Sequence, residues 1–292
     1  MTVRADCSGL SVVIPACNEE GALARTLEEV ASVLPGAEIL VVDDGSTDGT
    51  PALATRLGVR VISHPYQKGN GAAIKTGARQ ATGGIIVFMD GDGQHRPEDI
   101  PRLLAKLDEG FDMVVGARVS RKSQASLHRA AANGFYNRFA TWMTNHEVPD
   151  LTSGFRVVKA SLFKRFLYLL PNGFSYPTTI TMAFFRSGYS VAYEPIEVDK
   201  RIGKSHIRLW RDGVRFLLII FKIGTLFSPL KLFLPISLAF FLTGFGYYAY
   251  TFLSSGRFTN MSALLFITSV LVFLIGLVSE QITALMYREP ED

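Results

Sequence analysis

The chain has 292 residues, of which 48% are hydrophobic and 19% are charged, with a formal net charge of +4 at pH 7. So much apolar sequence with so little net charge excludes an intrinsically disordered protein, and two cysteines are too few for a disulfide framework. The mean hydropathy of +0.22 is high for a water-soluble protein. The position of the apolar residues along the chain therefore decides the class of protein.

The N-terminal part of the chain alternates short apolar runs with segments of helical periodicity. Strands are predicted at residues 10–14, 38–42, 59–62, 84–89 and 113–116. Helices are predicted between them, at residues 19–33, 48–57, 71–81 and 97–109. Asn18 is a candidate N-cap for the first helix, and Pro97 suits the start of the last one. Strands that alternate with helices predict a doubly wound, mostly parallel α/β sheet.

Polar residues follow three of these strands, at the edge where parallel sheets bind ligands. The segments are Pro15-Ala16-Cys17-Asn18-Glu19, Asp43-Asp44-Gly45-Ser46 and Asp90-Gly91-Asp92-Gly93-Gln94-His95. Carboxylates that meet at one edge repel one another unless a cation or hydrogen-bond donors lie among them. Two aspartates at spacing two in a glycine-rich turn can hold a hard divalent metal, which commonly bridges to substrate phosphates.

Residues 68–76 form a glycine-rich segment that ends in Lys75-Thr76, as a P-loop ends in Lys-Ser/Thr. It does not match, because Ile74 rather than glycine precedes Lys75. The glycines instead predict a loop that enters a helix N-terminus near a phosphate or a sugar.

The stretch between Arg118 and His146 carries five Lys or Arg residues and no acid. Large apolar side chains recur in it at helical spacing, at Phe135, Phe139, Trp142 and Met143. Residues 206–228 have the same basic and aromatic character. Both stretches, the first at about residues 126–145, are predicted to be amphipathic helices at a membrane surface. The alternative for each is an ordinary helix that packs on the core.

The most apolar part of the chain is its C-terminal part. No charged residue occurs from Leu232 to Gly256, and none occurs from Phe258 to Ser279. Each run is long enough to cross a bilayer, and the short turn between them predicts an antiparallel hairpin. We expect transmembrane helices at about residues 232–254 and 261–283, the alternative being two buried helices of a soluble core.

The distribution of Lys and Arg predicts the orientation of this hairpin. Residues 200–231 are rich in both, whereas the turn carries only Arg257. The positive-inside rule then places the N-terminal domain and both chain ends in the cytoplasm. The expected organisation is a cytosolic domain at 1–205, an interface helix at 206–228 and the hairpin at 229–292. The hairpin explains the basic residues, so nucleic acid is not expected as a partner.

Taken together, these segments resemble the family 2 glycosyltransferases, which have the GT-A fold. Motifs common to that family are matched by residues 12–20, 41–48, 68–71 and 89–95. The polyprenyl-phosphate branch, which includes dolichyl-phosphate mannosyltransferases and bacterial undecaprenyl-phosphate glycosyltransferases, is matched by residues 115–118, 150–156 and 201–205. The resemblance covers nearly the whole chain, including the hairpin.

The chain departs from the family pattern at three points. His206 follows Ser205 where the family often has Lys, and Cys17 stands where an aromatic residue is frequent. These departures put one phosphate contact and base stacking in doubt. The Gln-x-x-Arg-Trp motif of processive synthases is absent from the sequence, which argues against a polymerase.

The resemblance implies inverting transfer of a single sugar from a UDP- or GDP-linked hexose to a polyprenyl phosphate. The implied donor site consists of Pro15, Ala16, Cys17, Glu19, Val42, Asp43, Asp44, Lys68, Asp90 and Gly91. Implied ligands for Mg²⁺ or Mn²⁺ are Asp90, Asp92 and Gln94. The acceptor phosphate would be held by Arg118, Arg129, Arg201 and Lys204. Implied catalytic residues are Asp92, Arg118 and Arg201. A homo-oligomer is left open.

Two other functions remain open at this point. A glycosyltransferase that acts on the hydroxyl of another membrane lipid would need a general base, and the sequence offers no obvious one. A membrane scaffold with this fold and no activity is the second alternative, since fold does not guarantee function. A polyprenyl phosphate needs no strong base, because its attacking oxygen is already anionic near neutral pH.

Overall fold

The computed structural model describes residues 7, 9–118, 127–173, 175–198, 221–222 and 224–287. Within 127–133 it describes the backbone alone. Arg201, Lys204, the side chain of Arg129 and most of the predicted helix at 206–228 therefore lie outside the described residues. The chain divides into two compact units, residues 1–205 and 206–292, and each unit is described by itself.

The first unit is built on a 7-stranded sheet with the order β3-β2-β1-β4-β6-β5-β7. The strands are β1 (Leu10–Ala16), β2 (Glu38–Asp43), β3 (Arg60–Ser63), β4 (Ile85–Phe88), β5 (Met113–Arg118), β6 (Arg156–Lys159) and β7 (Val191–Ile196). Strands β3, β2, β1 and β4 are parallel, and so are β5 and β7. Strand β6 is antiparallel to both β4 and β5. The predicted mostly parallel sheet is confirmed, but β6 and β7 were not predicted.

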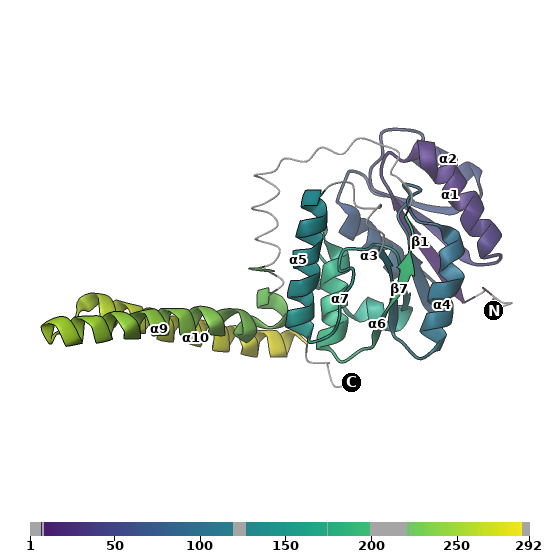
Figure 1. Ribbon diagram of the computed structural model, residues 1–292. Coiled ribbons are helices and arrows are strands. Elements are labelled where there is room, and N and C mark those ends of the chain that lie inside the picture. Colours follow the sequence, from purple (N-terminus) through teal and green to yellow (C-terminus); the bar gives the residue numbers. More distant parts are fainter. Residues whose placement is uncertain are drawn as a thin grey trace. The chain divides into compact units, whose positions relative to one another are not determined.

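Helices cover both faces of this sheet (Figure 1). They are α1 (Glu20–Val33), α2 (Thr50–Arg56), α3 (Asn70–Gln80), α4 (Ile100–Asp108), α5 (Leu127–Thr144), α6 (Ala160–Arg165) and α7 (Tyr176–Arg186), with a 3₁₀ turn, η1 (Pro97–Asp99), before α4. The helices predicted in the first part of the chain are confirmed. Asn18 was wrongly predicted as an N-cap. Its φ is 57°, and its Oδ1 accepts a hydrogen bond from Thr47 N (2.8 Å) in the loop after β2.

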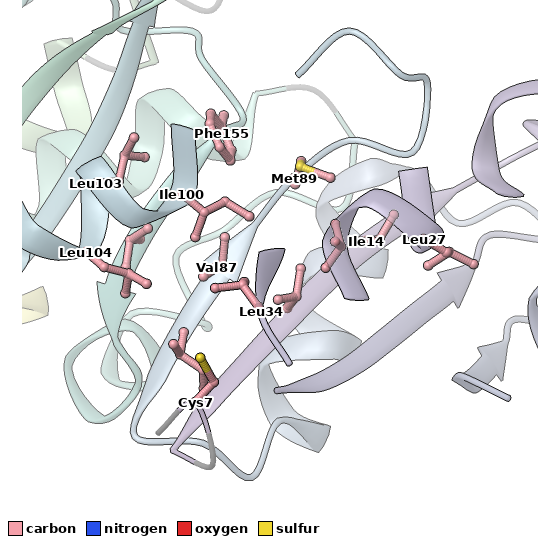
Figure 2. Packing of buried hydrophobic residues seen from close by; sticks show 14 of the residues in the cluster. Cys7, Ile14, Leu27, Leu34, Val87, Met89, Ile100, Leu103, Leu104 and Phe155 are labelled. Atoms are coloured by element: carbon pink, nitrogen blue, oxygen red, sulfur yellow. The ribbon is translucent and has the colours of Figure 1, made fainter. Parts of the chain in front are cut away.

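The main core lies between the sheet and helices α1 and α4 (Figure 2). Helix α4 buries Ile100, Leu103, Leu104 and Leu107, which recur at helical spacing. On the sheet, Ile14 and Val87 face the same cluster, and Cys7 is buried in it as a core thiol. Each large apolar side chain buried in this way contributes about 1.5–3 kcal/mol. This packing fixes the strands whose carboxyl ends carry the polar segments.

The second unit is a helical hairpin of α9 (Pro229–Ser255) and α10 (Asn260–Met286). Gly256 ends α9 in the left-handed conformation (φ 63°), and the Thr259 hydroxyl accepts a hydrogen bond from Ser262 N at the start of α10. Both helices are long and apolar enough to cross a membrane. In their most apolar stretches only 11% and 17% of the residues are buried. Helices of a soluble core would be mostly buried, so the structure favours the predicted hairpin over that alternative.

Small residues form the seam between the two helices. The buried positions in α9 include Ser237, Gly244 and Thr251, and those in α10 are Ser262, Ser269, Gly276 and Thr283. Within each helix these positions recur every seven residues, which keeps them on one face as in a coiled coil. Ser237 and Ser269 each donate a hydroxyl hydrogen bond to the other's backbone carbonyl (2.9 Å). The seam therefore joins the helices through close backbone approach and paired hydroxyl groups.

Candidate active site

A pocket with a volume of about 450 Å³ opens where β1, β2 and β4 end. Its lining residues are Pro15, Ala16, Cys17, Asn18, Glu19, Asp44, Gln67, Asn70, Ala73, Asp90, Gly91 and Asp92. Strand β1 lies between β2 and β4, so Asp44 and Asp90 flank the end of β1 on opposite sides. Two strand spacings separate them, which is about 10 Å. The pocket thus has a carboxylate at each end.

Asp44 at the β2 end is held by donors from the protein itself. Its Oδ1 accepts hydrogen bonds from His64 Nδ1 (2.8 Å) and Lys68 N (2.9 Å), and its Oδ2 accepts one from Gly69 N (2.7 Å). Burial alone would raise the pKa of Asp44, but these hydrogen bonds and the charge of His64 bring it below its usual value. Asp44 is therefore an ionised anchor for the loop that precedes α3. His64, which follows β3, was missed because nothing in its local sequence pairs it with Asp44.

The glycines of the segment at 68–71 serve close packing of the backbone. A Cβ on Gly69 would lie 2.6 Å from the carbonyl oxygen of Asn172, and one on Gly71 would collide with that of Pro171. Ala72 N donates to Asn172 O (2.9 Å) at the start of α3. At Ala72 the backbone N–H is therefore occupied by a carbonyl of the chain. Asn70 and Ala73, in the same turn of the helix, line the pocket, and the approach of a phosphate or a sugar to this helix N-terminus stays a prediction.

Asp90 and Asp92 form the other end of the pocket. Asp92 Oδ1 accepts a hydrogen bond from Gln94 N (3.1 Å), and the Asp90 carboxylate lies against Gly154, where a Cβ would be 3.0 Å from Oδ2. Among the described residues, no three His, Cys, Asp or Glu side chains are grouped to hold a metal alone. Mg²⁺ is usually held by one or two carboxylates together with substrate phosphates and water. Two carboxylates at one end of a pocket fit a metal that binds with a diphosphate.

Arg118, at the end of β5, is paired with an acid from a distant segment. Its Nε and Nη2 bind Asp150 Oδ2 (2.7 Å) and Oδ1 (2.9 Å), and Nη2 also donates to Thr152 Oγ1 (2.6 Å). Burial would raise the pKa of Asp150, but Arg118 lowers it below the usual value. Within the part of the chain that the structure describes, Nη1 of Arg118 donates no hydrogen bond. Asp150 was missed as a site residue because it lies 32 positions from its partner.

A buried arginine organises the loop between Asp150 and β6. Arg156 is fully buried and donates to Ser153 O, to Pro177 O (3.2 Å) and to Thr181 Oγ1 (3.2 Å). Its guanidinium group lies over the ring of Tyr176 (5.5 Å to the centroid), and the Tyr176 hydroxyl donates to Gly154 O (3.0 Å). Two successive carbonyls are thereby fixed, and Gly154 is the residue packed against Asp90. This network was not predicted.

Two further side chains, His95 and Cys17, have pKa values shifted by their surroundings. His95 is buried and stacks on Phe155 (ring centroids 5.0 Å apart). Burial lowers the pKa of His95 to about 4 despite the charge of Asp92. Cys17, in the pocket wall, accepts a weak hydrogen bond from Gln67 Nε2 (3.6 Å). Burial, followed by nearby carboxylates, of which Asp44 acts most strongly, raises the pKa of the Cys17 thiol. The thiol is therefore not activated as a nucleophile.

The structure separates the predicted donor-site residues into two groups. Those that line the pocket are Pro15, Ala16, Cys17, Glu19, Asp44, Asp90 and Gly91, together with the metal-site residue Asp92. Val42 is fully buried in β2, Asp43 Oδ1 accepts from Ser46 N (3.0 Å), and Lys68 Nζ lies over the Tyr66 ring. The sequence missed Asn18, Gln67, Asn70 and Ala73 as lining residues. Asn70 lies inside the motif at 68–71, which was the available signal for it.

Comparison with known proteins adds to this geometry. The model for Glycosyl transferase family 2 matches residues 11–167, more than half of the chain. The chain belongs to glycosyl transferase family 2. A model named GtrB C-terminal hairpin matches residues 228–285 of this glycosyltransferase. The predicted family is therefore confirmed for the domain, and the hairpin has a family match of its own.

Named relatives of this glycosyltransferase cover most of its domain. It is 29% identical to the dolichyl-phosphate hexose transferase of Haloferax volcanii over 206 residues, 70% of this chain and 89% of the relative. It is also 29% identical to the polyprenol monophosphomannose synthase of Mycolicibacterium smegmatis over 204 residues, 65% of this chain and 77% of the relative.

Solved structures confirm the GT-A type of fold. Glucosyl-3-phosphoglycerate synthase from Mycobacterium tuberculosis, in complex with Mn²⁺, UDP and glucosyl-3-phosphoglycerate, matches with a TM-score of 0.57 and 23% identity, over 74% of this chain and 78% of that one. Another structure of that enzyme contains Mg²⁺ and UDP. At this identity the likeness establishes the fold alone.

Proposed function

We propose that this glycosyltransferase transfers one sugar from a nucleotide-diphosphate sugar to a polyprenyl phosphate at the cytoplasmic face of a membrane. The observation that carries the proposal is the union, in one chain, of an acidic pocket at the ends of β1, β2 and β4 and a hairpin with an apolar exterior. One of the two relatives is named a dolichyl-phosphate hexose transferase, and the other is named a polyprenol monophosphomannose synthase. The hairpin match supports the same function.

The donor would lie across the strand ends. In this proposal Pro15, Ala16 and Glu19 contact the nucleotide, and Asp90 and Asp92 hold Mg²⁺ or Mn²⁺ beside the diphosphate. The metal, when bound, supplies positive charge that stabilises the leaving nucleoside diphosphate. The carbonyl of Gly154 accepts a hydrogen bond from the Tyr176 hydroxyl, which fixes the position of Gly154. Gly154 in turn packs against the Asp90 carboxylate and keeps it in place. Gln94 is proposed to complete the metal site from the same turn.

The acceptor phosphate would meet the donor beside Arg118. The bond to Asp150 orients this guanidinium group, and its Nη1, which donates no hydrogen bond to a described residue, is available to a phosphate oxygen. Arg129, Arg201 and Lys204 remain proposed as further phosphate ligands. The anionic phosphate oxygen attacks the anomeric carbon, the bond to the nucleoside diphosphate breaks, and the configuration inverts. No residue has to remove a proton from the acceptor.

In this proposal the membrane holds the acceptor lipid and anchors the enzyme. A polyprenyl chain stays in the bilayer, so its phosphate is accessible at the surface. We propose that α9 and α10 span the bilayer and that the domain and both chain ends are cytoplasmic. On α5, Phe135 and Trp142 are exposed whereas Tyr136, Ala140 and Met143 are buried, so one face of this helix offers aromatic side chains to lipid headgroups.

The test is a label-transfer assay with the full-length protein in detergent. It would combine dolichyl or undecaprenyl phosphate, Mg²⁺ or Mn²⁺, and a panel of labelled UDP- and GDP-sugars. We expect label in the lipid fraction with one donor, and a loss of about a hundredfold or more in Asp92→Ala. Glu28→Ala, which removes an exposed carboxylate on α1, is the matched control and should retain activity. Label on a lipid hydroxyl but not on polyprenyl phosphate would contradict the proposal.

A further inference from the structure

The pairing of two strands brings Gly154 against Asp90. Strand β4 is antiparallel to β6, and Phe88 pairs with Arg156. Because antiparallel partners advance in opposite directions along the chain, the same register continued to Asp90 brings it opposite Gly154. The contact is direct, since a Cβ on Gly154 would lie 3.0 Å from Asp90 Oδ2 and 3.4 Å from Oδ1. The backbone at residue 154 therefore forms one wall around the Asp90 carboxylate.

This stretch of backbone is held by two buried side chains. The Tyr176 hydroxyl, at the start of α7, donates to Gly154 O (3.0 Å), and Arg156 donates to Ser153 O. The guanidinium group of Arg156 also lies over the Tyr176 ring. Burial raises the pKa of the Tyr176 hydroxyl, while the charge of Arg156 opposes this rise and that of Asp90 adds to it. The hydroxyl therefore stays protonated at neutral pH and remains a donor to Gly154.

We propose that Gly154 and Tyr176 are positioning residues for the divalent metal, because they hold the Asp90 carboxylate in the orientation that binds it. This inference rests on the proposed function, in which Asp90 and Asp92 hold the metal. Gly154 has no side chain to offer a metal, and the Tyr176 hydroxyl donates to a carbonyl. Their effect passes through the carboxylate. Gly154 limits its movement by contact, and Tyr176 keeps the backbone at residue 154 from moving away.

Two substitutions disturb this arrangement in different ways. The φ of Gly154 lies outside the left-handed region, so alanine fits the backbone, and its Cβ would push the Asp90 carboxylate by a few tenths of an ångström. Tyr176→Phe keeps the ring beneath the Arg156 guanidinium group and removes only the hydroxyl that binds Gly154 O. The first variant crowds the carboxylate, and the second loosens the wall against which it packs.

The experiment measures metal binding without catalysis. Mn²⁺ would be titrated into the full-length protein in detergent, with UDP or with GDP, and water proton relaxation would report the metal bound to the slowly tumbling protein. Gly84→Ala is the control for the added methyl group, because a Cβ at Gly84 would meet no atom within 4 Å. Tyr189→Phe is the control for the lost hydroxyl, which accepts a hydrogen bond from Arg165 Nη1 (3.0 Å). Thermal melting of each variant reports its folding.

We expect Gly154→Ala and Tyr176→Phe each to weaken Mn²⁺ binding by about tenfold, and both controls to bind Mn²⁺ as the wild type does. An unchanged Mn²⁺ affinity in either variant would overturn the inference, and a lower melting temperature alone would show a structural role only. Failure of the proposed function looks different. In that case the two variants would still weaken Mn²⁺ binding, while no label reached polyprenyl phosphate. A wild-type protein that binds no Mn²⁺ would overturn both the inference and the proposed metal site.

Discussion

In the domain the buried side chains are large and apolar, such as Ile14, Val87 and Phe155, and the carboxylates lie at the rim of the sheet. In the hairpin the pattern is reversed. Ser237 and Gly244 are buried at the seam, while Leu253 is 85% exposed together with most other large side chains of α9 and α10. The two units of one chain therefore bury opposite kinds of residue.

The difference indicates that the two units fold in different solvents. In water, removal of apolar surface from the solvent is the main driving force. In hydrocarbon that force is absent between helices, and small residues are favoured because they allow close backbone contact and hydroxyl hydrogen bonds. The same side chain thus has opposite effects in the two units, and substitutions that are neutral in one should be costly in the other.

The largest expected effect is a cavity in the core of the domain. Phe163 on α6 is fully buried, with its ring centroid 4.5 Å from that of Phe88. Phe163→Ala should lower the free energy of unfolding by about 3–5 kcal/mol, whereas Leu253→Ala on the exposed hairpin surface should change it by less than about 0.5 kcal/mol. Urea unfolding of the full-length protein in detergent measures both. A similar loss in the two variants would break the comparison.

A smaller effect is expected when the seam of the hairpin is filled. A Cβ on Gly276 would lie 2.6 Å from Phe233 Cβ, whereas one on Gly246 would meet no atom within 4 Å. Gly276→Leu should destabilise the hairpin by about 1–3 kcal/mol through overpacking, and Gly246→Leu is the matched control. SDS-induced unfolding in mixed micelles measures the difference. Equal sensitivity of the two variants would show that the helices do not meet at this seam.

The domain should also be the acid-sensitive unit. Asp112 binds Lys159 Nζ (2.7 Å) and the N–H and hydroxyl of Ser190 (both 2.9 Å). Burial would raise its pKa, but these partners bring it below the usual value. The stabilisation is therefore present above pH of about 4, the unfolded pKa, and is lost as the pH falls through the folded value. Asp112→Asn should remove about 1 kcal/mol at pH 7 and flatten the acid limb of the stability profile. An unchanged acid limb would assign the sensitivity to other carboxylates.

The smallest effect concerns the paired hydroxyl groups of the seam. Ser237→Ala removes one of the two reciprocal hydrogen bonds with Ser269 and should weaken the hairpin by about 0.6 kcal/mol. Ser254→Ala, at an exposed serine near the turn, is the control. SDS titration of the two variants side by side resolves this difference, and a larger loss at Ser254 would argue against the seam.

The spacing of apolar residues predicted most of the secondary-structure elements, but it did not predict β6. The strands from β1 to β5, the helices between them and the hairpin follow from the spacing of apolar residues and were all predicted. Strand β6 has only four residues, Arg156–Lys159, and its place between β4 and β5 depends on pairing with residues far away in the chain. A short apolar run gives no signal for such an antiparallel insertion.

In the candidate site, too, the sequence predicted some residues and missed others. Asp44, Asp90 and Asp92 follow predicted strands, and the rule that ligands bind at carboxyl ends placed them together. Partnerships across the chain were not predictable, because neither the pairing of Arg118 with Asp150 nor that of His64 with Asp44 has a local signature. The same holds for Gly71, whose absent side chain makes room for a turn a hundred residues away.

The sheet order also sets an order of events on the ribosome. Strand β5 is synthesised before β6, the strand that joins it to β4, so its edges are open to wrong partners until β6 and β7 follow. The parallel strands β1 to β4 can assemble earlier, since N-terminal parts generally fold first. Helices α9 and α10 come last, after every strand of the sheet has been made. The growing chain thus never exposes its apolar hairpin while strands of the sheet are still missing, which separates in time the two steps most prone to aggregation.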